Sequence, residues 1–230
     1  MAEYRIGRGW SNRELESRLA DLRFRSRNFS EPADELTTAR GWHSYYSEST
    51  IARFADGAES EAAFERGKIA VAGYQFSDPR IVIGHFDPDA SLLGRLMLLE
   101  MRALRFVHYL AGVVVGDVRS EEGTNSSVYG FRYDTLEGHI EAGVEWFLLT
   151  RIHPTGELRF RVEAAWRPGQ FPNWWSRLGF RFLGPYYQRK WHRLAHQRLS
   201  DLVRYPVLHP PRPRRGRLAH TGPKVTFNRS

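Results

Sequence analysis

The chain of 230 residues contains no cysteine, which excludes disulfides, thiolate nucleophiles and cysteine-ligated metal sites. It also lacks the run of about 18 apolar residues that a membrane-spanning helix requires. Its first residues, MAEYRIGRGW, contain no apolar segment of the kind found in secretory signals. The sequence therefore predicts a cytoplasmic protein without a transmembrane segment.

Three enzyme motifs are absent as well: Gly-x-Ser-x-Gly, the GKS/GKT phosphate loop and Gly-x-Gly-x-x-Gly. Acyl-transfer and nucleotide-dependent chemistry thus have no positive support. His192 and His196 have the spacing of a zinc-binding pair, but Arg193 stands where glutamate would be needed, and the surrounding basic residues would repel a cation. We therefore expect the two histidines on a solvated helix face, and neither a metal nor a cofactor.

Acidic residues are nearly missing from the last part of the chain. Residues 1–166 hold 20 Lys and Arg against 25 Asp and Glu, a net charge of −5, whereas residues 167–230 hold 14 against one, a net charge of +13. Any anionic partner, a membrane surface or RNA, should therefore meet the C-terminus. The candidate contacts are Arg189, Lys190, Arg193, Arg212, Arg214, Arg215 and Arg217.

The clearest pattern is a strict alternation of apolar and polar residues in two arms. Positions 140, 142, 144, 146 and 148 are apolar, and His139, Glu141 and Glu145 stand between or before them. In the second arm the even positions from 158 to 166 are apolar, and a turn sequence at 153–156 separates the arms. The sequence predicts an antiparallel β-hairpin whose even positions face the core.

Helical patterns flank this hairpin. Ser11 and Glu14 form a capping box that begins a short helix, and Ser60 can cap a second helix over residues 61–72. After a break at Gly184-Pro185, a final amphipathic helix is predicted over residues 185–203.

Strands rich in β-branched and aromatic residues are predicted near 42–54, 80–86 and 113–118. Segment 92–110 fits an amphipathic helix by propensity. With 41% hydrophobic residues the chain can bury one core.

We expect one domain over residues 11–203. It is flanked by an N-terminal tail over 1–10 and by a basic, Pro/Arg-rich, disordered tail over 204–230.

The start of the hairpin resembles the signature of an uncharacterised protein family, UPF0548, whose domain is described as DUF1990. The run GFRYDTLEGHIEAGVEWF at 130–147 is similar to the family form GFAYGTLPGHPERGEERF. Residues 62–66 resemble the early helix of the family, and residues 167–168 and 177–179 resemble its approach to the last helix. The resemblance covers residues 12–203.

The resemblance implies an α+β fold of the helix-grip type, as in the START and Bet v 1-like superfamily. There a curved antiparallel sheet wraps around a long C-terminal helix and encloses an apolar cavity. It also implies a strand, not a helix, in segment 92–110. The family has no assigned activity, so the resemblance implies no catalytic residues.

The hairpin offers one cluster with acid–base or metal-binding chemistry: His139, Glu141 and Glu145, with Tyr133 if its strand pairs with the first arm. The simpler alternative is a polar outer face of the sheet, on which the two glutamates meet Arg159 or Arg161. Which way this face points decides between the two.

Three hypotheses for function follow. The first is a non-catalytic domain that binds a small apolar or amphipathic ligand between the sheet and the last helix. The second is an enzyme that uses the same cavity, with His139, Glu141 and Tyr133 as proton-transfer groups. The third is an interaction protein that docks on anionic lipid or RNA through its basic C-terminus. The candidate cavity residues are Trp146, Phe160, Trp166, Trp174, Phe182 and Trp191.

Overall fold

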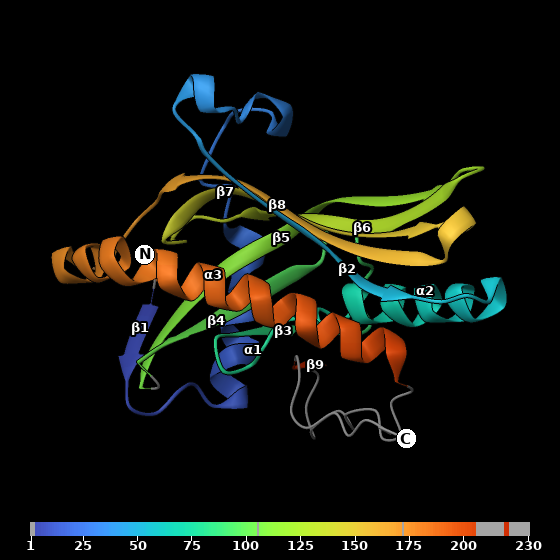
Figure 1. Cartoon of the computed structure of the whole chain (residues 1–230). Helices are drawn as coiled ribbons and strands as arrows, with labels where there is room; N and C mark the ends of the chain where they lie inside the picture. Colours follow the sequence, from blue (N-terminus) through green and yellow to red (C-terminus); the bar gives the residue numbers. More distant parts are fainter. Residues whose placement is uncertain (1–2, 105, 172, 206–218, 221–230) are drawn as a thin grey trace.

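The molecule is an antiparallel sheet crossed on one face by a long helix, α3 (Trp174–Arg204) (Figure 1). The computed structural model describes residues 3–104, 106–171, 173–205 and 219–220. The arrangement confirms the α+β, helix-grip architecture. No helix of the described segments is long and apolar enough to cross a membrane.

The sheet has nine strands in the described residues, in the order β2-β8-β7-β6-β5-β4-β3-β9, with β1 paired to β5. All of the pairings are antiparallel. The strands are β1 (Glu3–Ile6), β2 (His43–Arg53), β3 (Val82–Phe86), β4 (Leu96–Ala103), β5 (Val107–Glu122), β6 (Ser126–Thr135), β7 (Glu141–Ile152), β8 (Glu157–Pro168) and β9 (Ala219–His220).

Two shorter helices accompany α3. Helix α1 (Asn12–Asp21) begins at the predicted capping box, in which the Ser11 side chain accepts from the Glu14 amide and the Glu14 carboxylate accepts from the Ser11 amide. Short 3-10 turns complete the chain: η1 (Leu22–Phe24), η2 (Ala33–Glu35), η3 (Thr38–Arg40) and η4 (His153–Thr155).

Two predicted helix boundaries are wrong. Helix α2 (Gly57–Ala72) begins earlier than predicted, because Asp56, not Ser60, caps it by accepting from the amides of Ala58 and Glu59. Helix α3 runs through Pro185 without the predicted break. Pro185 is exposed, so water can replace the hydrogen bond that its missing N–H cannot make.

Within segment 92–110, residues 96–103 lie in β4 and residues 107–110 in β5, not in the helix that propensity favours. In β4, Met97 and Leu99 face the core under α2 and α3, whereas Leu98 faces the smaller core under α1. Because both faces are buried, apolar residues occupy nearly every position, and such a run cannot be told from a helix by its period. The family resemblance predicted this strand correctly.

The main core lies between the sheet and the two helices α2 and α3. Its centre is a connected cluster of aromatic rings around Phe76 and Phe147, which also includes Tyr74, Phe131, Phe160 and Trp191. Two smaller clusters cover the opposite face. One holds Leu15 of α1 with Leu22, and the other packs Phe29 and Trp42 on Val144 of β7.

The chain ends differ from the predicted tails. Residues 3–6, predicted as part of an N-terminal tail, form β1 and pair with residues 107–110 of β5. Of the predicted C-terminal tail, residues 219–220 pair as β9 with β3. Residues 206–218 and 221–230 lie outside the described residues.

The hairpin of β7 and β8 exists as predicted, but the facing of β7 is reversed. Even positions of β8, such as Phe160 and Val162, enter the main core as predicted, but in β7 it is the odd positions Phe147 and Leu149 that pack against them. Trp146 lies on the opposite face. Since Val144 is buried there too, both faces of β7 carry apolar residues and alternation alone does not identify the inner one.

Phe147, fully buried among aromatic rings, should dominate the stability of the core. We expect Phe147→Ala to lower the free energy of unfolding by about 3–5 kcal/mol. The matched control Phe182→Ala removes a ring that is 70% exposed and should change it by less than about 0.5 kcal/mol. Urea denaturation measures both, and equal effects would contradict the assigned core.

Candidate functional site

A small polar pocket lies between the inner face of β6, β7 and β8 and helix α3. Its volume is about 30 Å³, enough for one or two water molecules. It is lined by Tyr133, Thr135, Glu141, Gly143, Val144, Glu145, Ala164, Trp166 and Gln188. The larger apolar cavity expected between sheet and helix is absent at Phe160 and Trp191, because both pack into the aromatic core.

Strand register brings the polar groups of this pocket together. Tyr133 of β6 pairs with Glu145 of β7, Glu145 pairs with Ala164 of β8, and Ala164 pairs with Tyr45 of β2. Direct cross-strand partners point to the same side of a sheet, so this row faces α3. The small methyl group of Ala164, between two larger side chains, leaves the space that the pocket occupies.

The Tyr133 hydroxyl donates a hydrogen bond to the Glu145 carboxylate. Tyr133 is 8% exposed, and burial together with the neighbouring negative charge raises the pKa of its phenol well above the ordinary value. The phenol therefore stays protonated at neutral pH and remains a donor. The structure thus places Tyr133 and Glu145 on the inner side, and Glu145 does not meet Arg159 or Arg161 on an outer face.

Glu141 lies on the same side of β7, where its side chain lines the pocket. Burial raises the pKa of Glu141 to about 7. Burial also raises the pKa of Glu145, to about 8. The hydrogen bond from Tyr133 lowers this pKa, and the charge of Glu141 raises it further. Two interacting carboxyls titrate as a pair. Near neutral pH this pair retains at least one proton on average.

His139, the third member of the predicted cluster, stands apart from the pocket lining. It precedes β7 and is 2% exposed, and its Nδ1 accepts from the Glu141 backbone amide at 3.0 Å. That contact leaves the proton on Nε2, which has no hydrogen-bond partner in the described structure. Burial lowers the pKa of His139 to about 4, so a neutral imidazole orients the start of β7.

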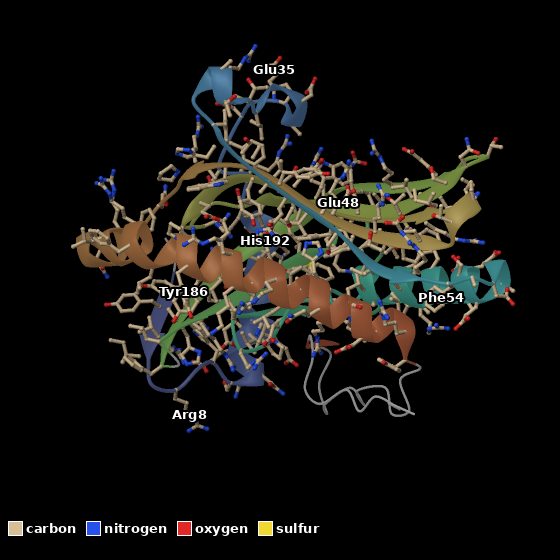
Figure 2. The ribbon with its side chains drawn as sticks, in the orientation of Figure 1. Arg8, Glu35, Glu48, Phe54, Tyr186 and His192 are labelled. Carbon is tan, nitrogen blue, oxygen red and sulfur yellow. The ribbon has the colours of Figure 1, made fainter. Side chains whose placement is uncertain are left out.

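The prediction that His192 and His196 lie on a solvated face is wrong. His192 is 3% exposed and points from α3 toward the sheet, where it stacks on Tyr45 with ring centroids 4.0 Å apart (Figure 2). The Ser47 hydroxyl lies 3.2 Å from its Nδ1 and 3.1 Å from Nε2 of His196. Burial lowers the pKa of His192 to about 3, so it is neutral. No group of three potential metal ligands occurs in the described residues.

The other predicted cavity residues divide into three groups. Trp166 lines the pocket as expected. Trp146 lies on the outer face, 5.6 Å from the guanidinium carbons of both Arg119 and Arg132, and Phe182 is exposed on α3. The side chain of Trp174 lies outside the described part of the structure.

The predicted basic contacts are only partly described. Arg189 and Arg193 are exposed on α3, and Lys190 lies 5.8 Å from the Tyr186 ring. Arg212, Arg214, Arg215 and Arg217 lie outside the described residues. Nothing in the described residues supports an anionic lipid or RNA partner.

Sequence reasoning missed Gln188, Thr135 and Tyr45. Gln188 stands one helical turn before His192, so the helical period links the two once the buried face of α3 is known. Thr135 bonds to both backbone groups of Gly143 and to the Asn28 side chain. Tyr45 could be found only from the pairing of β2 with β8, which sequence alone does not give.

The fold and the pocket define an α+β protein of the helix-grip type with an acidic pocket beneath its last helix. The chain belongs to the family described as "Domain of unknown function (DUF1990)", whose model matches residues 28–199. No curated protein matches the chain.

Solved structures that are similar to the chain share little of its sequence. The crystal structure of Ara h 8.0201 is 12% identical, with a TM-score of 0.40 over 71% of this chain and 98% of that one. An uncharacterised protein from Rhizobium leguminosarum is 13% identical, with a TM-score of 0.35 over 70% of this chain and 94% of that one.

The raised pKa of Glu145 has a consequence for stability. The folded protein binds the Glu145 proton more tightly than the unfolded chain does. The contribution of this proton to the free energy of unfolding is therefore complete below about pH 4.5 and is lost as the pH rises through about 8. We expect Glu145→Gln to raise the melting temperature at pH 9 by roughly 10 °C relative to its effect at pH 5, because about three pH units of linked stability are lost between these values.

Thermal unfolding followed by circular dichroism between pH 5 and pH 9 measures this difference. Glu59→Gln, which neutralises an exposed glutamate of α2, is the control for loss of charge. A parallel shift of both variants across the pH range would show that Glu145 is not desolvated.

Proposed function

We propose that this protein binds a small amphipathic ligand whose polar end is an amine, with the amine seated against Glu141 and Glu145. The observation that supports this most directly is the position of the two carboxyls, which share the core side of β7 and line the pocket. Acidic residues on the inner side of a strand cost folding free energy, which a binding role explains.

The chemistry of the pocket favours a cation. Glu141 and Glu145 line the same pocket, and the charge of Glu141 raises the pKa of Glu145, so an ammonium group bound beside them would oppose this repulsion and lower the pKa of both. The Tyr133 hydroxyl and the Gln188 amide can accept hydrogen bonds from it, and the Trp166 ring offers an aromatic wall. A cavity of about 30 Å³ has room for the ammonium group alone, so the apolar body of the ligand would lie outside it.

The test uses 2-phenylethylamine as the probe and 2-phenylethanol as its uncharged counterpart. We expect isothermal titration calorimetry to show binding of the amine, with proton release, and an affinity for the alcohol at least about tenfold lower. Glu145→Gln and Glu141→Gln should each weaken binding of the amine by about tenfold or more.

Phe182→Ala, which alters an exposed ring of α3, serves as the control and should bind like the wild type. Equal binding of amine and alcohol, or unchanged binding by both glutamine variants, would contradict the proposal. Native mass spectrometry of freshly purified protein would also reveal a co-purified ligand.

A second candidate function is proton-transfer catalysis in the same pocket. The observation that favours it is the Tyr133–Glu145 hydrogen bond on the inner face, beside Glu141 with a pKa of about 7, which suits a general acid or base. His139 does not belong to this machinery, because its ring does not line the pocket.

Proton-transfer catalysis would exchange carbon-bound protons of a bound molecule with protons of the solvent. A ligand that co-purifies with the protein would be incubated in D₂O with the wild type and with Glu141→Gln. Deuterium incorporation at carbon, lost in the variant, would support catalysis, whereas its absence in the wild type would exclude this form of it.

A further inference from the structure

A second and larger hollow lies on the outer face of the sheet, opposite the acidic pocket. Its volume is about 490 Å³, within the usual range of about 300–1,000 Å³ for small-molecule sites. It is lined by Leu22, Arg23, Arg25, Arg27, Gly94, Leu96, Val114, Gly116, Arg132, Asp134 and Leu136. We call this surface the arginine cleft. None of its residues was predicted as functional from the sequence.

Two of its four arginines are fixed by one buried acid. Asp134, 2% exposed, accepts from Arg132 Nε at 2.8 Å, and Arg27 Nη1 lies 3.5 Å from its Oδ2. Gly116 makes this possible, since a Cβ there would lie 2.4 Å from the Asp134 carboxylate. The bulge between Val115 and Asp117 thus admits the acid that anchors the cleft.

The other two guanidinium groups have no carboxylate partner in the described residues. Arg25 Nη1 donates to the backbone carbonyl of Glu137 at 3.2 Å, and the Glu137 carboxylate accepts from the Ser26 amide instead. Arg23 lies against the Phe24 ring. Four arginines with Asp134 as the sole acid in the lining leave the cleft strongly positive.

Besides two glycines, the rest of the lining is apolar: Leu96 and Val114 are half-buried and face the hollow, and Leu22 and Leu136 are buried beneath it. A guanidinium group binds carboxylate and phosphate through paired hydrogen bonds, and an apolar floor favours a hydrocarbon body. We propose that the arginine cleft binds a small organic anion, a phosphate ester or carboxylate attached to an apolar group. The proposal does not rest on the function assigned to the inner pocket, since the two lie on opposite faces.

The test uses phenyl phosphate, with inorganic phosphate and phenol as the two halves of the probe. Calorimetry on the wild type should show that phenyl phosphate binds more tightly than either half. Arg23→Gln/Arg25→Gln removes two charges without breaking an ion pair and should weaken binding of phenyl phosphate by about tenfold or more. The control Arg8→Gln/Arg13→Gln removes the same amount of charge from two exposed arginines outside the cleft. Arg8 extends from the edge of the molecule (Figure 2).

This control should change the affinity by less than about twofold. Thermal unfolding of both double variants establishes that they remain folded. Failure of phenyl phosphate to bind the wild type, or an equal loss in both double variants, would overturn the proposal. Inorganic phosphate binding as tightly as phenyl phosphate would overturn the assignment of an apolar ligand body.

Discussion

The hydrogen bond from Tyr133 to Glu145 across β6 and β7 is the contact on which the pocket depends. It exists only in the register that pairs these residues, and a shift by one position would move Glu145 to the outer face. In the same register Phe147 and Leu149 reach the main core. The free energy gained by burying these apolar side chains therefore stabilises the register that keeps Glu141 and Glu145 on the inner face of β7.

Strand β6 serves both faces of the sheet. Tyr133 and Thr135 point toward α3 and the acidic pocket, whereas Arg132 and Asp134, alternating with them, line the arginine cleft. Period-two alternation thus places groups of opposite charge back to back. Ion pairs on the outer side and partly protonated acids on the inner side give the two hollows different ligand chemistry.

Much of the architecture could be predicted from the sequence. The capping box at Ser11, the hairpin turn near residue 154 and the even positions of β8 follow from local chemistry and period. The facing of β7 and the strand nature of β4 could not, because both strands are buried on two sides and their apolar residues do not alternate cleanly.

The site was predicted only in part for a related reason. The sequence pattern predicts four residues of the pocket as candidates, namely Tyr133, Glu141, Glu145 and Trp166. That they share one side of the sheet depends on the register across three strands. The roles of Tyr45 and His192 depend on where α3 crosses β2, a contact between segments almost 150 residues apart that no local pattern encodes.

The central claim is that Glu141 and Glu145 form a desolvated, partly protonated pair on the inner face of β7. Carbon-13 NMR of protein labelled at the glutamate carboxyl carbons, titrated from pH 3 to pH 10, measures their ionisation directly. Two resonances should titrate with apparent pKa values near 7 and 8, and each should be lost or displaced in Glu141→Gln and Glu145→Gln. Titration of both carboxyls near the ordinary value of about 4.3 would contradict the account.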